Sequence, residues 1–225
     1  MIFRQMFERE SSTYTYLVGS EGEAALIDPV REEVPRYLQL LSELGLRLVV
    51  AIDTHVHADH VTGLGELRAQ TGCVTVMGER AGSDCVTRKV RDGEVIAVGA
   101  LRLTALATPG HTDDSMSYLM GDRVFTGDTL LIRSTGRTDF QNGDPEAQYE
   151  SLFERLLRLP EATAVYPGHD YKGWTVSSIG EERAHNPRLK ATTPEAYVAQ
   201  MRALKLPNPK LMDIAVPANL ACGRV

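Results

Sequence analysis

The segment Asp53–Gly63, with the sequence DTHVHADHVTG, holds three of the six histidines of this 225-residue chain, together with two aspartates. Neutral imidazoles and carboxylates are ligands that zinc, iron and other first-row metals bind in proteins. Histidines spread over a solvent-facing surface rarely gather in one short stretch. The segment therefore predicts a metal site rather than an ordinary exposed loop.

Three further segments end in a residue that can bind a metal. ATPGH ends at His111, FTGD at Asp128 and VYPGH at His169, and each follows an apolar run typical of a strand. Loops that leave the ends of a sheet are where side chains converge on a cavity. The ligands expected to lie together are His55, His57, Asp59, His60, His111, Asp128 and His169. This set exceeds one tetrahedral site and predicts one or two metal ions. The sixth histidine, His185, is expected on a solvated helix surface.

Hydrophobic periodicity predicts the elements that position these residues. Strands are expected at AALIDP and RLVVAIDT, and the second runs directly into the histidine segment. Apolar residues recur at helical spacing from Val34 to Leu44, just before Gly45, and LGELRAQTG predicts another helix after the histidines. Residues 95–108 and 116–128 each alternate around a turn and predict two β-hairpins.

Helices dominate the expectation for the second half of the chain. Asp144 and Pro145 form an N-cap and first-turn pair, and an apolar stripe continues until Pro160 stops the helix. AVYPGH predicts another strand, and TPEAYVAQMRALKL predicts a last helix. The Pro-rich segment 207–220 has no periodicity that predicts an element.

Composition excludes several classes of protein. Hydrophobic residues make up 43% and charged residues 24% of the chain, no stretch is apolar enough to span a bilayer, and the N-terminus lacks a secretory signal core. We therefore expect one cytoplasmic domain. The net charge of −6 opposes nucleic-acid binding and favours a small-molecule partner. Three cysteines without CxxC spacing, Cys73, Cys85 and Cys222, predict free thiols rather than a disulfide.

The succession THVHADH, PGH, GD and GH resembles the metallo-β-lactamase superfamily over most of the chain. The resemblance implies an α/β (α+β) fold, an αββα sandwich of two mixed β-sheets flanked by helices, with a metal cleft at one edge. It also implies one domain over residues 1–225, in which the segment from about 170 to 225 completes the substrate cleft. Because the superfamily hosts many chemistries, the fold cannot choose among them.

Two families within the superfamily remain as candidates. Nucleases and flavo-diiron proteins carry additional domains for which this chain is too short. The segments LLIRSTGRTDFQNGDPEAQYESL and IAVPANLACG resemble the persulfide dioxygenases of the ethylmalonic-encephalopathy type, also called sulfur dioxygenases. Thr138 and Asp139 depart from the aromatic segment of glyoxalase II-like enzymes. A two-metal hydroxyacylglutathione (thioester) hydrolase stays the alternative, and a metal-binding sensor without turnover is a third hypothesis.

The resemblance places one Fe²⁺ per chain on three catalytic residues, His55, His111 and Asp128, which form the facial triad of non-haem iron oxygenases. The residues expected around them as hydrogen-bond partners are His57, Asp59, His60 and His169. Those expected to bind the substrate are Arg137, Tyr171 and Arg188. The implied reaction oxidises glutathione persulfide with O₂ and water to sulfite and glutathione. Neither nucleic acid nor a membrane is an expected partner, and a homo-oligomer such as a dimer is compatible with the sequence.

Overall fold

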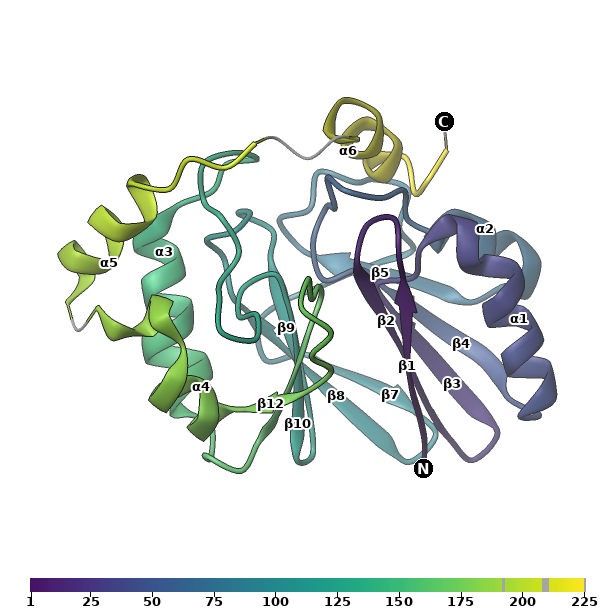
Figure 1. The fold of residues 1–225 in the computed structure, drawn as a ribbon. Coiled ribbons are helices and arrows are strands. Elements are labelled where there is room, and N and C mark those ends of the chain that lie inside the picture. The colour runs from purple at the N-terminus through teal and green to yellow at the C-terminus, as the bar shows by residue number, and fades with distance from the viewer. Residues whose placement is uncertain (192, 208–210, 225) are drawn as a thin grey trace.

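The computed structural model of the chain describes residues 1–191, 193–207 and 211–224 (Figure 1). It contains two six-stranded β-sheets. The first has the order β1 (Ile2–Glu8), β2 (Thr13–Ser20), β3 (Glu23–Ile27), β4 (Arg47–Ile52), β5 (Val74–Gly78) and β6 (Arg88–Val90). β1, β2 and β3 pair antiparallel, whereas β3 to β6 pair parallel. This sheet is therefore mixed.

The second sheet is mixed as well. Its order is β12 (Ser177–Ser178), β11 (Ala164–Pro167), β10 (Arg123–Gly127), β9 (Met116–Met120), β8 (Leu101–Ala107) and β7 (Val95–Val98). β10 and β11 pair parallel, and the other neighbours pair antiparallel. The β7–β8 and β9–β10 hairpins confirm the two hairpins expected from the sequence.

Helices cover the outer faces of both sheets (Figure 1). α1 (Val34–Glu43) and α2 (Leu64–Thr71) lie on the first sheet, and α3 (Pro145–Tyr149), α4 (Ile179–His185) and α5 (Pro194–Arg202) lie on the second. The Asp144 carboxylate accepts hydrogen bonds from the first-turn amides of α3, which confirms the predicted cap. Two sheets between two helical layers are the αββα sandwich that the resemblance implies.

Three apolar layers hold the sandwich together. Between the sheets, aromatic side chains from both sheets pack against one another, with the Tyr16 and Phe125 ring centroids 5.0 Å apart. Tyr37 packs α1 onto the first sheet, and Leu156, in the 3₁₀ helix Leu156–Arg158, and Tyr197 of α5 pack the second helical layer onto the second sheet. Burial of each such side chain contributes about 1.5–3 kcal/mol. The strand ends that carry the predicted ligands are thus held by a rigid core.

The C-terminal part differs from the expectation. α5 ends at Arg202, and the Pro-rich segment with no predicted element contains α6 (Met212–Leu220), with Pro217 inside it. Residues 208–210 of that segment, and residue 225, lie outside the described residues. A proline inside a helix removes a backbone hydrogen bond, and α6 is held by tertiary contacts such as those of Asn219 with the loop after β4. Among the described residues, no helix is long and apolar enough to cross a membrane.

The prediction of three free thiols is wrong. Cys85 and Cys222 form a disulfide, with their Cα atoms 5.9 Å apart and a sequence separation of 137. Cys73 is buried and free. The fold brings the loop between β5 and β6 next to the end of α6, and cysteine spacing carries no information on such a long-range approach.

Candidate metal centre

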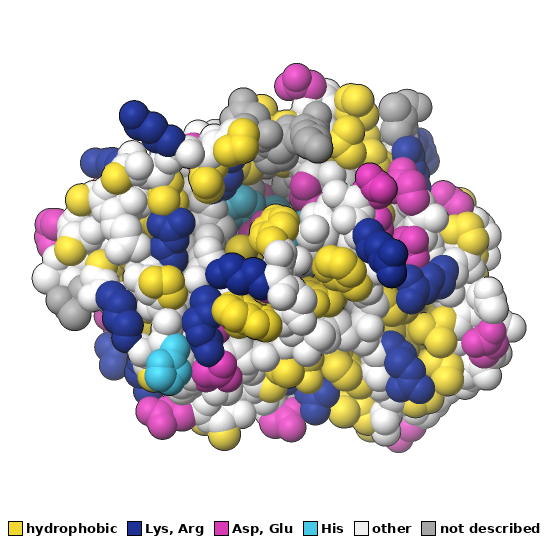
Figure 2. Space-filling model, viewed as in Figure 1, with side chains coloured by type: hydrophobic (Ala, Val, Ile, Leu, Met, Phe, Trp, Pro, Cys, Tyr) yellow, Lys and Arg dark blue, Asp and Glu magenta, His cyan; other side chains and the backbone are white. Residues whose placement is uncertain are grey.

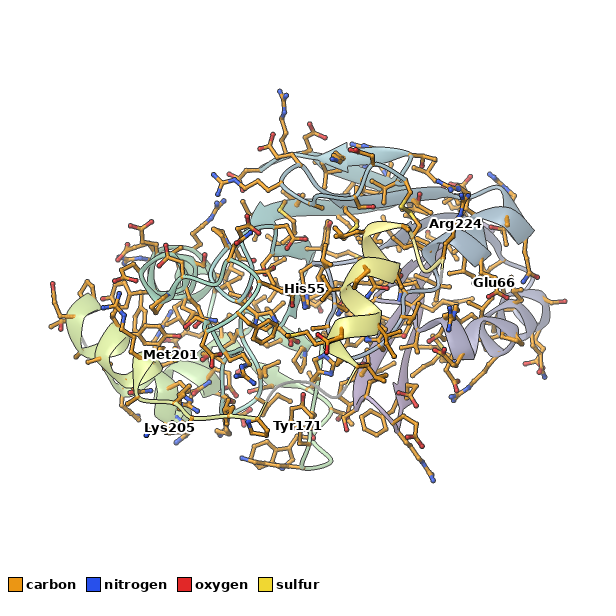
Figure 3. All side chains as sticks on the ribbon, turned by 90° about the horizontal axis from the view of Figure 1, so that it is seen from above. His55, Glu66, Tyr171, Met201, Lys205 and Arg224 are labelled. Atoms are coloured by element: carbon orange, nitrogen blue, oxygen red, sulfur yellow. A yellow bond between two sulfur atoms is a disulfide. The ribbon has the colours of Figure 1, made fainter. Side chains whose placement is uncertain are left out.

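The seven predicted ligands lie on four loops at one edge of the sandwich. Four of them follow β4, and His111, Asp128 and His169 follow β8, β10 and β11, respectively. All five imidazoles are buried, whereas the Asp59 and Asp128 side chains keep 23% and 13% of their surface exposed. Figure 2 shows a hollow in this face with histidine side chains inside it, and Figure 3 looks onto the same edge with His55 near its centre.

Three groups of three side chains have the geometry to hold a metal ion, and two of them consist only of predicted ligands, whereas the third joins His57 to the buried carboxylates of Asp28 and Asp53. Ligand atoms of His55, His111 and Asp128 lie within 4.8 Å of one another. A second group with the same spread consists of His57, Asp59 and His169. His60 belongs to neither group, but its Nδ1 lies 2.9 Å from Asp59 Oδ2. The structure thus brings the predicted ligands together and divides them between two neighbouring positions.

The two histidines of the first group are oriented by fixed partners. His55 Nδ1 lies 2.9 Å from the Thr54 hydroxyl, and His111 Nδ1 lies 2.7 Å from the carbonyl oxygen of Arg137. Each partner accepts a hydrogen bond when Nδ1 carries the proton, and Nε2 is then the free lone pair on both rings. Asp128 Oδ1 is buried and without a hydrogen-bond partner among the described residues. A cation between these three side chains would satisfy that oxygen.

Asp28 is a functional residue that the sequence reasoning missed. Its carboxylate accepts hydrogen bonds from the backbone amide (2.7 Å) and hydroxyl (3.0 Å) of Thr54, and its Oδ1 lies 3.2 Å from His57 Nε2. Its backbone φ is 52°, in the left-handed region. In the sequence, the pair Asp28-Pro29 indicates only a turn. One buried carboxylate therefore holds His57 directly and His55 through Thr54.

Burial and neighbouring charges separate the protonation states of the site. Burial lowers the pKa of His55 and His57 well below the usual range, with a further contribution from neighbouring imidazoles, so both are neutral and available as ligands. Burial also lowers the pKa of His169, but the carboxylates of Asp128 and Asp59 outweigh this effect and raise it to about 9. His169 is therefore protonated at pH 7 and faces both carboxylates at 3.6 Å.

A pocket of 370 Å³ adjoins the histidines. His169, Tyr171 and Arg188 line it, so the structure brings two of the three predicted substrate-binding residues to one place beside the ligands. The Tyr171 ring lies parallel to the His169 ring with centroids 6.0 Å apart, and it is 71% exposed. Lys172 also lines the pocket. Arg133 lines the pocket as well, but it is paired with Glu181 and Glu182, so Arg188, Lys172 and the Tyr171 phenol are the groups that suit an anionic ligand with an apolar part.

Arg137, the third predicted substrate-binding residue, is placed differently. Its guanidinium makes a bidentate ion pair with Asp139 at 2.6 and 2.7 Å and donates to the carbonyl oxygens of Leu206 and Pro207. Its side chain is only 11% exposed, and it does not line the 370 Å³ pocket. Because these partners occupy the guanidinium, the visible role of Arg137 is to tie its loop to the C-terminal segment. His185, expected on a solvated helix surface, is exposed at the end of α4.

Comparison with known proteins places this geometry in a family. Residues 9–169 match the family model described as the metallo-beta-lactamase superfamily. The chain is 47% identical over 228 residues to the persulfide dioxygenase ETHE1, mitochondrial, of Homo sapiens, which covers 99% of this chain and 89% of that protein. The crystal structure of ETHE1 from Myxococcus xanthus superimposes with a TM-score of 0.97, at 57% identity and full coverage of both chains.

A hydrolase resembles the chain less. The hydroxyacylglutathione hydrolase of Methylobacterium nodulans is 38% identical over 170 residues, which is 70% of this chain and 66% of that protein. The match to the persulfide dioxygenase spans 99% of this chain. It therefore includes the C-terminal segments that contact the site loops, Leu206–Pro207 and α6.

Proposed function

The chain belongs to the metallo-β-lactamase superfamily and, within it, to the persulfide dioxygenases, and we propose that it works with one ferrous ion and glutathione persulfide. It is an enzyme that oxidises a persulfide with O₂. The observation that carries the proposal of one iron is the group His55, His111 and Asp128, whose ligand atoms lie within 4.8 Å of one another. Two imidazoles and one carboxylate are the ligand set of non-haem Fe(II) oxygenases.

The protein side of this centre fits one ferrous ion. His55 and His111 each have Nδ1 next to a hydrogen-bond acceptor, and Asp128 keeps a buried oxygen without a partner among the described residues. His169 Nε2 lies 3.6 Å from an oxygen of each of Asp59 and Asp128, so its charge favours a role as an electrostatic partner of these carboxylates. The two oriented imidazoles and the buried Asp128 oxygen support a metal ion at this position.

The side chains of this protein would bind the substrate, orient it and exclude water from the site. Bound iron would supply the redox chemistry between the persulfide and O₂ that side chains cannot supply. The overall reaction consumes glutathione persulfide, O₂ and water and forms glutathione, sulfite and two protons. The buried imidazoles keep bulk water from the reacting sulfur, and His57, held by Asp28, is fixed at the side of the His55 ring, 4.2 Å between centroids.

We place the glutathione part of the substrate in the 370 Å³ pocket. Arg188 and Lys172 offer cationic partners for its two carboxylates, and Tyr171 offers a ring and a hydroxyl beside His169. The described part of the segment from about 170 to 225 would in this way complete the substrate cleft. Arg137 supports the cleft indirectly, through Asp139 and the carbonyl oxygens of Leu206 and Pro207.

An oxygen electrode tests the proposal. Ferrous protein with glutathione persulfide should consume O₂ rapidly and accumulate sulfite, whereas Asp128→Ala should do neither. S-D-lactoylglutathione should be hydrolysed slowly or not at all, because one iron lacks the two-metal arrangement that positions hydroxide. Efficient thioester cleavage under nitrogen, with no O₂ uptake on persulfide, would favour the hydrolase. O₂ uptake without dependence on added iron would refute the choice of metal.

The cellular location and the oligomeric state of this protein are predictions from its sequence. The mammalian relatives are named mitochondrial, and the composition of this chain predicts a cytoplasmic protein. Cell fractionation with an antibody to the chain and sedimentation of the purified protein measure these two properties.

A further inference from the structure

The side chain of Asn219, on α6, is buried against the ligand loop that follows β4. Its Nδ2 donates to the carbonyl oxygens of His57 (2.9 Å) and His60 (2.8 Å), and its Oδ1 accepts from the amide of Thr62 (2.8 Å). One amide group thus satisfies three backbone groups of the loop across more than 150 residues of sequence.

These three backbone groups lie outside the strands and helices, and none of them has a backbone hydrogen-bond partner in the part of the chain that the structure describes. Buried backbone groups without partners are costly, and a segment whose groups have partners in only one conformation adopts that conformation. His57 and His60 flank Asp59, and His55 lies two residues before the first bonded carbonyl. The contact therefore fixes the backbone from which four of the predicted ligands project.

The residues after α6 pack against the ligand loop and the first turn of α2, through close contacts that only glycine permits. The amide of Gly65 donates to the carbonyl oxygen of Cys222 (3.0 Å), and a Cβ at Gly65 would lie 2.3 Å from that oxygen. A Cβ at Gly223, whose φ is 81°, would lie 2.1 Å from the carbonyl oxygen of Thr62. The Cys85–Cys222 disulfide ties this end covalently to the loop between β5 and β6. Asn219 is held only three residues from that link.

We propose that Asn219 is a positioning residue of the metal centre, and that the Cys85–Cys222 disulfide keeps it seated on the ligand loop. The inference rests on the proposed metal centre. Loss of the Asn219 amide frees the carbonyls of His57 and His60 and lets the loop take several conformations. Metal affinity then falls, because the ligands must be ordered at the moment of binding.

Anaerobic titration with Co²⁺, followed by its visible absorption, tests the role of Asn219. Asn219→Ala should bind Co²⁺ about 10- to 100-fold more weakly and with an altered spectrum. Thr75→Val is the matched control, because Thr75 is equally buried and its hydroxyl accepts from the backbone amide of Thr87 (3.1 Å), while β5, to which it belongs, leads into none of the loops that carry the predicted ligands. It should lose thermal stability but keep the Co²⁺ affinity and spectrum.

An Asn219→Ala protein with the unchanged affinity and spectrum overturns the positioning role. Equal losses in Asn219→Ala and Thr75→Val also overturn it, since the effect is then one of general stability. If the unsubstituted protein binds neither Co²⁺ nor Fe²⁺, the proposed metal centre itself fails, which is a different result from failure of Asn219 alone.

The role of the disulfide is tested without touching Asn219. Cys85→Ser, which opens the link at its partly exposed end, should weaken Co²⁺ binding in the same direction as Asn219→Ala but by less, because Asn219 still has its partners. Cys73→Ser removes the buried free thiol and should leave the affinity unchanged. Equal affinities for Cys85→Ser and Cys73→Ser would overturn the disulfide part of the inference.

Discussion

The two imidazoles of the proposed iron site are oriented by partners of different kinds. The partner of His55 is its sequence neighbour Thr54, whose hydroxyl donates in turn to the buried carboxylate of Asp28. The partner of His111 is a backbone carbonyl, that of Arg137. Both kinds of partner fix the tautomer and the orientation of the ring. The two ligands are thus equally well oriented but differ in electronic surroundings.

Asp128→Ala should lose iron and turnover together while the fold survives, because Asp128 lies on a loop after β10 and contributes no core packing. His57→Ala should retain much of its iron and lose activity in part, since we place His57 beside the ligands rather than among them. Iron per chain, measured by elemental analysis next to activity, checks both. Equal iron loss in the two variants would show that the ligand assignment is wrong, and two zinc ions in active protein would favour the hydrolase.

Arg188→Ala should raise KM for glutathione persulfide with little change in kcat or iron content, because a contact made equally in the ground and transition states contributes to binding alone. Arg137→Ala should also raise KM, but with a lower Tm, since it loses the ion pair with Asp139 and the bonds to two carbonyl oxygens. Steady-state kinetics and thermal melts separate the two effects. Arg158→Ala, an exposed arginine paired with Glu154, is the control. An unchanged KM in Arg188→Ala would remove it from the substrate site.

At the scale of elements, the loop 136–141 acts as a support for His111. Its Arg137 carbonyl accepts from the imidazole, the Phe140 ring packs edge-on against it with centroids 5.6 Å apart, and Gln141 Nε2 donates to the carbonyl of Val56 at 2.9 Å. The guanidinium of Arg137 lies over the Phe140 ring. The GRTDFQ motif therefore links the loops that carry His111 and His55.

Gly136→Ala should weaken metal binding, because its Cβ would lie 2.2 Å from the carbonyl oxygen of Asp128 and 2.8 Å from His111 Nδ1. Both atoms belong to proposed ligands, Asp128 and His111. Neither atom can move without displacing its residue from the metal site. Co²⁺ affinity measured by titration is the readout, with an expected loss of at least about tenfold. Gly121→Ala is the control: it places a side chain at a φ of 60° in a hairpin turn with no neighbour within 4 Å. If Gly136→Ala binds as tightly as Gly121→Ala, the loop does not support the ligands.

Over the whole molecule, the sandwich brings four strand ends from two sheets to one edge. β4 belongs to the first sheet, and β8, β10 and β11 belong to the second. The ligands of the proposed iron site therefore come from both sheets, His55 from one and His111 with Asp128 from the other. A metal ion at this position links the two halves of the fold, so metal binding and global stability are coupled.

Addition of Fe²⁺ under anaerobic conditions should raise the Tm, because a ligand that binds only the folded state stabilises it. At a free metal concentration 100 times Kd the expected gain is about 2.7 kcal/mol. Differential scanning calorimetry at several Fe²⁺ concentrations measures the shift, and Asp128→Ala should show little of it. A Tm independent of Fe²⁺ in the unsubstituted protein would mean that the centre binds no ferrous ion.

Several features follow from local sequence alone. The ligand types and their places after strands could be read from four short segments, because ligand chemistry belongs to the residue and strand ends are marked by apolar runs. α1, α3 and the two hairpins could be predicted for the same reason, since their periodicity, caps and turns are local. The N-terminal hairpin β1–β2 could not, because seven of the eight residues of β2 are buried and show no alternation between a polar and an apolar face.

The contacts between distant segments are determined only by the tertiary structure. The bond from Asn219 to the ligand loop, the Cys85–Cys222 disulfide and the ion-paired state of Arg137 each depend on where packing places the C-terminal segment. Asp28 reads as a turn residue until β3 and β4 pair in parallel and bring it next to Thr54 and His57. A residue's type states which bonds it can make, but its partners are set by the packing of the whole chain, which no single segment contains.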